Sequence, residues 1–160
     1  MQRRRLDPAA GPLLAEDDGA LLRARGIPYA HAARFAAPKP AAPWSDIRDA
    51  TMRGPVCPQL PSRLEWVTGP VVDGLEMRED CQVLSVTAPS DADALPVMVW
   101  LHGGAYVSGG GEAQKSDAAE LARRGRVVVV TVTYRLGIFG FLAPSGVDNL
   151  GLRDQILALR

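Results

Sequence analysis

The stretch PVMVWLHGGAYVSGGGEAQKSDAAELARRGRVVVVTVTY, residues 96–134, decides the fold class of this chain. It contains two continuous apolar runs, 97–101 and 127–133, separated by a glycine-rich loop and a segment of helical character. Continuous apolar runs on either side of a helix are typical of parallel strands buried on both faces of a sheet. The stretch therefore predicts a strand–helix–strand unit and an α/β fold.

Signals at both ends place the predicted helix at residues 116–124. Ser116 or Asp117 suits the N-cap, because its side-chain oxygen can accept a hydrogen bond from a free amide of the first turn. Gly125 follows the last helical residue, where a left-handed conformation commonly ends a helix.

The rest of the chain predicts short strands, loops and a final helix. Residues 33–61 are dense in proline, which excludes a helix or a central strand and indicates a path over the surface. Residues 83–87 alternate in polarity as a half-buried strand does. A helical pattern begins near Asn149 and continues to the end of the chain. We therefore expect short antiparallel strands that lead into the parallel strand–helix–strand unit. The last helix has no stop signal at Arg160, so we expect the sheet to be incomplete.

An incomplete sheet predicts an exposed edge. We expect strand 127–133 to be unpaired along one side and the last helix to have only part of its packing surface. An unpaired edge is a template for pairing with other chains. The isolated chain is therefore predicted to be marginally stable or prone to aggregation.

Composition indicates one globular domain. The chain has 160 residues, of which 47% are hydrophobic and 22% charged, as in ordinary globular proteins. Lys and Arg together number 18, as do Asp and Glu, so no net field attracts nucleic acid or an anionic membrane. No apolar run suits a signal peptide or a membrane span. We expect a cytoplasmic protein without a nucleic-acid partner.

Two cysteines, Cys57 and Cys81, bracket a proline-containing loop. They could form a disulfide if their Cα atoms come within reach, but a reducing cytosol favours two partly buried free thiols. With only two Cys and two His in scattered positions, the sequence predicts no zinc site. No cofactor is expected.

The motif HGGAY at residues 102–106 follows the apolar run 97–101 directly. A strand followed by a sharp glycine-rich turn is where esterase and lipase sheets present backbone amides to an oxyanion. Glycine suits the turn because, without a Cβ, the backbone can turn tightly and approach a small acyl group. The motif alone leaves a purely structural turn open.

With this motif included, a series of segments resembles the type-B carboxylesterase and cholinesterase family over nearly the whole chain. The resemblance implies an α/β hydrolase fold and hydrolysis of small-molecule carboxylic esters through an acyl-serine intermediate, without a cofactor. Residues 1–160 would be an N-terminal portion that ends before the nucleophile elbow. The segments are GIPYA (26–30) with Arg34 and Phe35, the proline segment 38–44, GPVCPQ (54–59), EDC (79–81), HGGAY (102–106), YRLGIFGFL (134–142) and NLGLRDQ (149–155).

The resemblance assigns the first two oxyanion donors to the amides of Gly104 and Ala105, with Gly103 supporting the turn. His102 would be structural, because a general base must reach a nucleophile. The catalytic Ser, acid and His are expected beyond Arg160, on a complementing C-terminal part.

No GxSxG pattern occurs in the chain, and neither Ser108 nor Ser145 fits one. A serine without a base has an ordinary, weakly nucleophilic hydroxyl. We therefore expect this segment to be inactive alone.

Scaffold positions follow from the same resemblance. Arg34 and Glu79 match positions that form an ion pair, although two solvated charges remain the alternative. Cys57 and Cys81 match a disulfide pair of secreted relatives, and Asp154 with Gln155 matches structural positions. The chain departs from the family in three places, which are Gln82 and Ser85 after EDC, where Leu and Asn are usual, and Thr133 before YRLG, where Asn is usual.

Two other functions are weighed against the esterase hypothesis. Residues 109–116, GGGEAQKS, approach a phosphate-binding loop, but Gln114 stands where that loop needs glycine before the lysine. A non-catalytic cholinesterase-like interaction module is the second alternative, since a fold alone does not fix a function.

Overall fold

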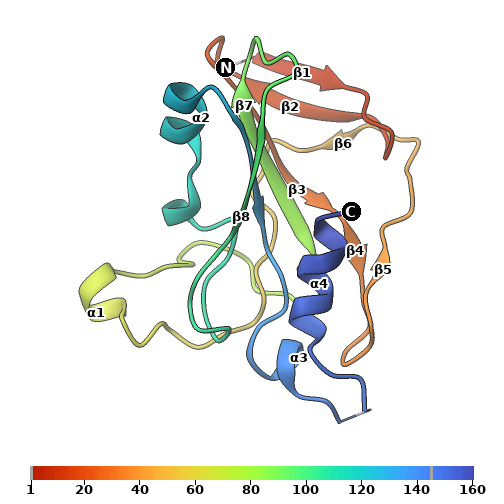
Figure 1. Ribbon diagram of the computed structural model, residues 1–160, viewed down its shortest axis with the longest axis vertical. Helices are drawn as coiled ribbons and strands as arrows, with labels where there is room; N and C mark the ends of the chain where they lie inside the picture. The colour runs from red at the N-terminus through yellow and green to blue at the C-terminus, as the bar shows by residue number, and fades with distance from the viewer. Residues whose placement is uncertain (1, 145) are drawn as a thin grey trace.

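The structure, a computed structural model, describes residues 2–144 and 146–160. Its centre is a mixed sheet in the order β1-β2-β3-β7-β9-β8, with β6 beside β2, and β4 pairs with β5 in a second, two-stranded sheet (Figure 1). The strands are β1 (Gln2–Leu6), β2 (Leu13–Asp17), β3 (Leu21–Pro28), β4 (Ala30–His31), β5 (Lys39–Pro40), β6 (Arg48–Asp49), β7 (Val83–Pro89), β8 (Val97–Leu101) and β9 (Val128–Val132).

The predicted strand–helix–strand unit is present. β8 and β9 run parallel, in register from Val97 opposite Val128 to Leu101 opposite Val132. Helix α2 (Ala119–Gly125) connects them and lies on the opposite side of the sheet from α4 (Leu150–Ala158) in Figure 1. Strands β1, β2, β3 and β7 pair antiparallel and precede this unit, which is the order that the sequence predicts.

The open edge of the sheet is β8, and the prediction that strand 127–133 carries it is wrong. β9 pairs in parallel with β8 on one side and antiparallel with β7 on the other. The crossover through α2 brings the later strand back between β7 and β8. The strand that comes first in the chain is therefore the one left at the edge.

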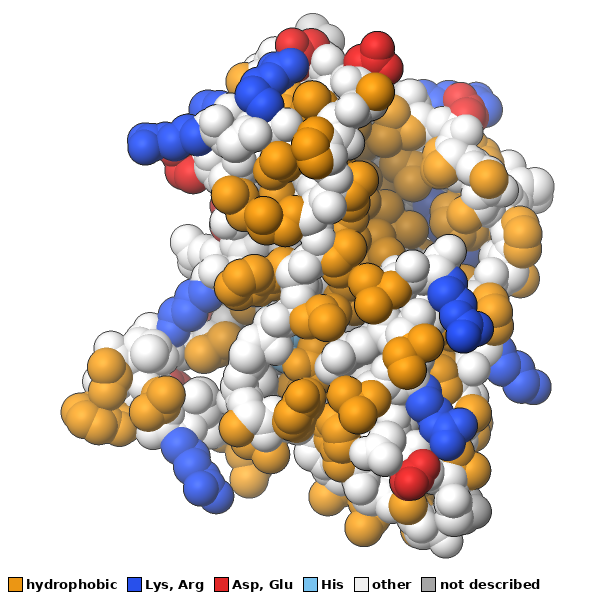
Figure 2. All heavy atoms as spheres, viewed as in Figure 1, with side chains coloured by type: hydrophobic (Ala, Val, Ile, Leu, Met, Phe, Trp, Pro, Cys, Tyr) orange, Lys and Arg blue, Asp and Glu red, His pale blue; other side chains and the backbone are white. Residues whose placement is uncertain are grey.

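The apolar run of β8 is exposed in this chain, so the prediction that it is buried on both faces is wrong. Its five residues, from Val97 at 63% to Val99 at 37%, all keep more than a third of their surface exposed. Figure 2 shows hydrophobic side chains gathered over the middle of the viewed face, where β8 runs in Figure 1. Leu152 and Ile156 of α4, and Leu159 directly after it, are exposed as well. An apolar edge strand is a site for association with another polypeptide segment.

Helix α2 begins later than the sequence indicates. A short 3₁₀ turn, Gln114–Ser116, precedes it, and the N-cap residue is Ala118 rather than Ser116 or Asp117. The Asp117 carboxylate nevertheless accepts a hydrogen bond from the Ala119 amide at 2.9 Å. The bond reaches the first amide of α2 from the residue before the N-cap, so the prediction that Ser116 or Asp117 is the N-cap is wrong.

In the described part of the chain, three small apolar clusters and three further helices accompany the sheet and α2. The first cluster lies within the N-terminal strands, the second between α2 and the sheet, and the third around the two cysteines. No helix in the described part of the chain is long and apolar enough to cross a membrane. The remaining helices are α1 (Glu65–Thr68), α3 (Gly137–Phe141) and α4 (Leu150–Ala158).

Helix α4 is fixed to the segment after β9 by a buried ion pair. The Arg135 guanidinium donates to both carboxylate oxygens of Asp154, at 2.8 and 2.9 Å, and the Arg135 amide donates to the same carboxylate at 3.1 Å. The two side chains are 3% and 0% exposed. Arg135 also donates to the Ala36 carbonyl at 2.8 Å, which ties the proline-rich segment to the same point.

Gln82 is a buried polar residue without a partner, and its replacement with Leu is expected to stabilise the chain. The residue is 1% exposed, and neither its amide oxygen nor its amide nitrogen has a hydrogen-bond partner among the described residues. Such an unpaired group costs about 1–3 kcal/mol, so Gln82→Leu should raise the free energy of unfolding by up to that amount. Urea-induced unfolding measures it.

Gln59 supplies the matched control for this substitution. Its side chain accepts from the Gly109 amide at 2.6 Å and donates to the carbonyls of Gly109 and Cys57 at 2.8 and 3.0 Å. Gln59→Leu should therefore destabilise the chain, because it leaves backbone groups unpaired. Destabilisation by both substitutions would show that the Gln82 amide is satisfied in solution.

Candidate active site

The candidate site is the glycine loop, residues 102–106, which follows the end of β8. Its backbone takes up positive φ angles at three successive residues, 125° at Gly104, 53° at Ala105 and 60° at Tyr106. Only glycine adopts such angles without strain, so the conformation of Ala105 and Tyr106 must be held by surrounding contacts. Strain of this kind concentrates at functional sites.

The first two carbonyls of the loop are held by aromatic side chains. The Tyr134 hydroxyl donates to the His102 carbonyl at 2.8 Å. The His102 ring lies with Nδ1 at 2.9 Å from the Gly103 carbonyl, which places the proton on Nδ1. Both side chains are buried.

The later carbonyls are held by backbone amides. The Gly104 carbonyl accepts from the amides of Val107 and Ser108, at 3.0 and 3.1 Å. The Tyr106 carbonyl accepts from the Gly137 amide at 2.7 Å, which attaches the loop to the start of α3. Four of the five loop carbonyls are thereby engaged with the protein.

The amides of the loop are free by contrast. The amides of Gly104 and Ala105 have no acceptor among the described residues. Successive amides left free by a turn with positive φ angles form a concave donor set that suits an anion or an oxyanion. The loop is thus built with its acceptors satisfied and its donors available.

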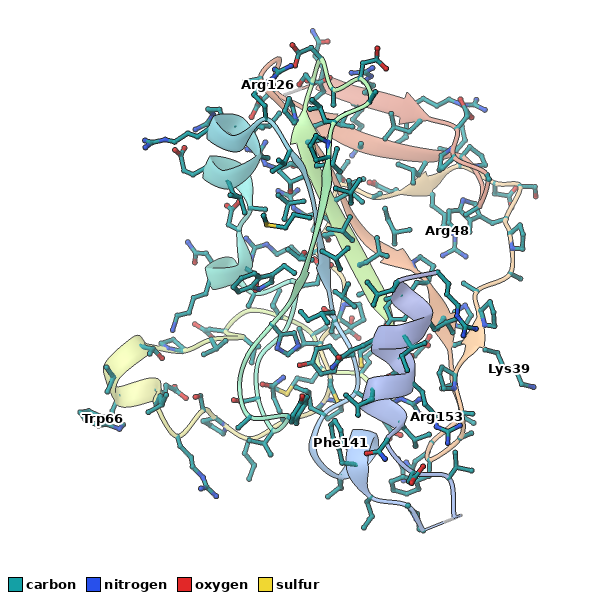
Figure 3. All side chains as sticks on the ribbon, viewed as in Figure 1. Lys39, Arg48, Trp66, Arg126, Phe141 and Arg153 are labelled. Carbon is teal, nitrogen blue, oxygen red and sulfur yellow. The ribbon has the colours of Figure 1, made fainter. Side chains whose placement is uncertain are left out.

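Two hollows adjoin the glycine loop. One, of about 230 Å³, is lined by Trp100, His102, Gly103 and Gly104 among others. The other, of about 590 Å³, is mostly apolar and lies on the Val107 side of the loop. Its lining includes Leu60, Pro61, Val107, Ser108, Ile138 and Phe139. Figure 3 shows Phe141 on α3. The Tyr106 ring packs against the Phe141 ring, with 5.0 Å between the ring centroids.

His102 is not arranged as a general base. The residue is 6% exposed, its ring stacks on Tyr134, and its Nε2 has no partner among the described residues. Burial lowers the pKa of His102, with a smaller opposing effect from the bond to the Gly103 carbonyl. The side chain therefore stays neutral and donates through Nδ1 to its own loop.

This burial predicts a loss of stability in mild acid. With the folded-state pKa below the ordinary value of 6.5, the unfolded chain binds more protons between these two values, so stability falls as the pH drops through that window. Denaturant unfolding at pH 7.5 and 5.5 should show a loss of at most about 1.4 kcal/mol per pH unit that is absent in His102→Phe. Equal slopes in the two proteins would contradict this origin.

The serines near the loop lack the partners of a nucleophile. The Ser108 hydroxyl is buried and lies 3.5 Å from the Gly104 carbonyl, to which it can donate. No hydrogen bond joins it to a His or a carboxylate among the described residues. Ser145 lies outside the described residues.

Comparison with known proteins gives the loop its context. A sequence profile of the carboxylesterase family matches residues 17–160. The chain belongs to the carboxylesterase family. It is 46% identical over 139 residues to a Rhodococcus erythropolis protein named "Probable N-octanoylanthranilate hydrolase AqdA2", with 84% of this chain and 30% of that protein covered.

Other relatives of this carboxylesterase-family chain are para-nitrobenzyl esterases. The Bacillus subtilis (strain 168) enzyme is 45% identical over 146 residues, with 85% of this chain and 29% of that protein covered. A solved structure of a thermophilic PNB esterase is 40% identical with a TM-score of 0.84, and the match covers 99% of this chain and 34% of that one. The chain thus spans about a third or less of the length of these relatives.

The two cysteines of the carboxylesterase-family chain lie together as free thiols, and both are fully buried rather than partly buried. The hydrogen bond from Cys81 lowers the pKa of the Cys57 thiol, while the same bond and burial raise that of Cys81. The Leu136 amide also donates to the Cys57 sulfur at 3.2 Å. The pair therefore joins the GPVCPQ and EDC segments to the residue before α3.

Arg34 and Glu79 form an ion pair, with the Arg34 Nε at 2.8 and 3.0 Å from the two carboxylate oxygens. Hydrogen bonds from Arg34 lower the pKa of the Glu79 carboxyl. His31 is exposed, and its Nδ1 lies 3.2 Å from an Asp80 oxygen. These contacts lie on the surface and do not reach the glycine loop.

Sequence reasoning missed the contacts of two residues, Gln59, which holds Gly109 behind the loop, and Glu112, which binds Ser85 and Gly26. The Gln59 side-chain amide binds both the N–H and the carbonyl of Gly109. The Glu112 carboxylate is buried and accepts from the Ser85 hydroxyl at 2.5 Å and from the Gly26 amide at 3.3 Å. The signal that could have revealed Glu112 is the departure at Ser85, since a residue smaller than asparagine leaves room for a second polar group.

Glu112 also bears on the phosphate-loop hypothesis for residues 109–116. Its buried carboxylate already occupies the Ser85 hydroxyl and the Gly26 amide, so these donors are not open to a phosphate. No group of three or more His, Cys, Asp or Glu residues that could hold a metal ion occurs in the part of the chain that the structure describes. The free amides of the glycine loop thus remain the strongest candidate for chemistry.

Proposed function

We propose that the complete protein hydrolyses small-molecule carboxylic esters through an acyl-serine intermediate, with the amides of Gly104 and Ala105 as oxyanion donors. The observation that carries the proposal is the hydrogen bonding of the glycine loop. Four of its five carbonyls are bonded to the protein, whereas these two amides are free among the described residues. The names of the similar proteins, a hydrolase and esterases, support the same class of reaction.

The proposed mechanism stabilises charge that develops in the transition state. When a serine attacks the ester carbonyl, the carbonyl oxygen becomes negative, and two preorganised N–H donors bind it more tightly than they bind the ground state. Each donor is worth about 3–4 kcal/mol in enzymes of this type. Gly103 supports the turn that brings both donors to the same side.

We place the nucleophile, acid and base on a complementing C-terminal part, in the same polypeptide or a separate one. The exposed edge of β8 and the exposed apolar residues of α4 give this part a surface on which to pack. Because β8 lies directly before the glycine loop, a strand added beside β8 would end next to the free amides. Without this part we expect no ester hydrolysis.

The free, buried thiols suit a reducing compartment, and we propose a cytoplasmic location on that ground. The apolar hollow of about 590 Å³ beside Val107 is a suitable size for the apolar part of a small ester. Neither feature calls for a metal or a cofactor.

A fusion tests the proposal. In the fusion esterase, residues 1–160 are followed by the part of the Bacillus subtilis para-nitrobenzyl esterase that this chain does not cover. It should hydrolyse p-nitrophenyl acetate and lose activity with phenylmethylsulfonyl fluoride, whereas the 160-residue chain alone should not hydrolyse the ester. A folded fusion without hydrolysis would overturn the proposal and favour the non-catalytic interaction module.

A further inference from the structure

His102 and Tyr134 form a buried stacked pair directly behind the glycine loop. Their ring centroids are 4.5 Å apart with an angle of 16° between the ring planes. The residues are 6% and 2% exposed, although each carries a polar group. Each polar group is used on the loop backbone, through Nδ1 of His102 and the hydroxyl of Tyr134.

The two rings hold successive peptide units. Tyr134 binds the His102 carbonyl and His102 binds the Gly103 carbonyl. In a planar trans peptide the carbonyl and the following N–H point in opposite directions. Holding these two carbonyls inward therefore turns the amides of Gly103 and Gly104 outward, away from the stacked rings.

The pair is backed so closely that the bond to Gly103 has little freedom. A Cβ added at Gly109 would lie 2.5 Å from the His102 Nδ1 and 2.6 Å from the Gly103 carbonyl oxygen. Gln59 holds Gly109 in this place, because its side chain binds both the backbone amide and the backbone carbonyl of Gly109. The bond thus has backbone of Gly109 on one side and the Tyr134 ring stacked on its donor.

We propose that His102 is a positioning residue, which orients the Gly104 amide as an oxyanion donor by holding the Gly103 carbonyl, and that Tyr134 fixes the preceding peptide unit by holding the His102 carbonyl. This inference rests on the proposed function for its catalytic consequence, while the orientation itself is a property of this chain. The neutral His102 donates with Nδ1, so its ring acts on the loop and takes no proton from substrate.

Backbone order in the 160-residue chain tests the orientation without any catalysis. His102→Phe keeps a ring against Tyr134 and removes the Nδ1 donor, whereas Tyr134→Phe removes only the hydroxyl. We expect the ¹⁵N order parameter to fall from about 0.85 to below about 0.6 at Gly104 in the first variant and at Gly103 in the second. Unchanged order parameters at both glycines would overturn the proposal.

Tyr29→Phe is the matched control. The Tyr29 hydroxyl also donates to a backbone carbonyl, that of Thr133, at 2.9 Å, so the substitution deletes the same kind of bond outside the loop. It should lower the melting temperature about as much as Tyr134→Phe and leave the glycine loop rigid. Equal loosening of the loop by both substitutions would show a general loss of packing and would count against positioning.

The fusion esterase separates positioning from the proposed function. If the parent fusion hydrolyses ester, His102→Phe should lower kcat about 10-fold with KM unchanged and weaken inhibition by phenylboronic acid by the same factor, while Tyr29→Phe changes kcat less than 2-fold. An inactive parent would contradict the proposed function, and the order parameters would still decide the positioning. An active parent with unchanged kcat in His102→Phe would overturn the positioning.

Discussion

Replacing Asp154 with asparagine is expected to lower the free energy of unfolding by about 3–5 kcal/mol, because it leaves the buried Arg135 guanidinium without a counter-charge. The pair is 3% and 0% exposed, and the carboxylate accepts from both the side chain and the amide of Arg135. Asparagine has nearly the same shape but offers one acceptor oxygen and no charge. The melting temperature should fall by roughly 6–20 °C, as followed by circular dichroism.

Two further variants test whether burial of the ion pair causes the stability loss in Asp154→Asn. Asp91 forms an ion pair with Arg126 at 2.8 Å, but both side chains are more than half exposed, so Asp91→Asn should leave the melting temperature nearly unchanged. Replacing both buried partners, Arg135→Met with Asp154→Leu, should recover much of the stability lost in Asp154→Asn. If Asp154→Asn and Asp91→Asn had equal effects, burial of the pair would not be the source of its contribution.

The strand–helix–strand unit was predictable from sequence because its signals are local. The apolar runs 97–101 and 127–133 identify β8 and β9, and the pattern after Asn149 identifies α4. Each of these signals lies within a few residues of the element that it predicts. The family resemblance, which rests on short motifs in a fixed order, was predictable for the same reason and is confirmed by the family match.

The order of strands was not predictable in this way. Nothing in residues 127–133 indicates that this strand enters between two others, because the position depends on the crossover and on β7, which ends at Pro89. The N-terminal hairpin was also missed. β1 has the sequence QRRRL with four exposed residues and no alternation, so its pairing with β2 left no periodic signal.

The candidate site also has a part that the sequence predicts and a part that it does not. The motif HGGAY predicts the location of the glycine loop, but the contacts that hold it come from Tyr134, 32 residues away, and from Gln59, which contacts Gly109 across 50 residues. The departure at Thr133 gains a reason only in the fold, where its hydroxyl accepts from the Gly111 amide at 3.0 Å. Long-range contacts of this kind are invisible to spacing and become evident only when the sheet is assembled.

Gly104→Ala in the fusion esterase is expected to lower kcat/KM by at least about 100-fold, the loss that follows removal of one oxyanion donor. Gly104 has φ of 125°, and a Cβ there would lie 1.8 Å from the Ser108 carbonyl oxygen, which is backbone and cannot rotate away. The loop must therefore shift, and the shift breaks the bonds from Val107 and Ser108 to the Gly104 carbonyl. Hydrolysis of p-nitrophenyl acetate measures the effect.

Gly103→Ala is the matched control, because it makes the same chemical change one residue earlier. A Cβ at Gly103 meets no atom within 4 Å, and Gly103 is not among the residues with positive φ. The Gly103→Ala variant should keep kcat/KM within about 10-fold of the parent fusion. The bonds from Tyr134 to the His102 carbonyl and from His102 to the Gly103 carbonyl can both persist. If the two alanine variants were equally impaired, bulk in front of the amides would be the cause. If Gly104→Ala were as active as the parent, the glycine loop would not be the oxyanion site.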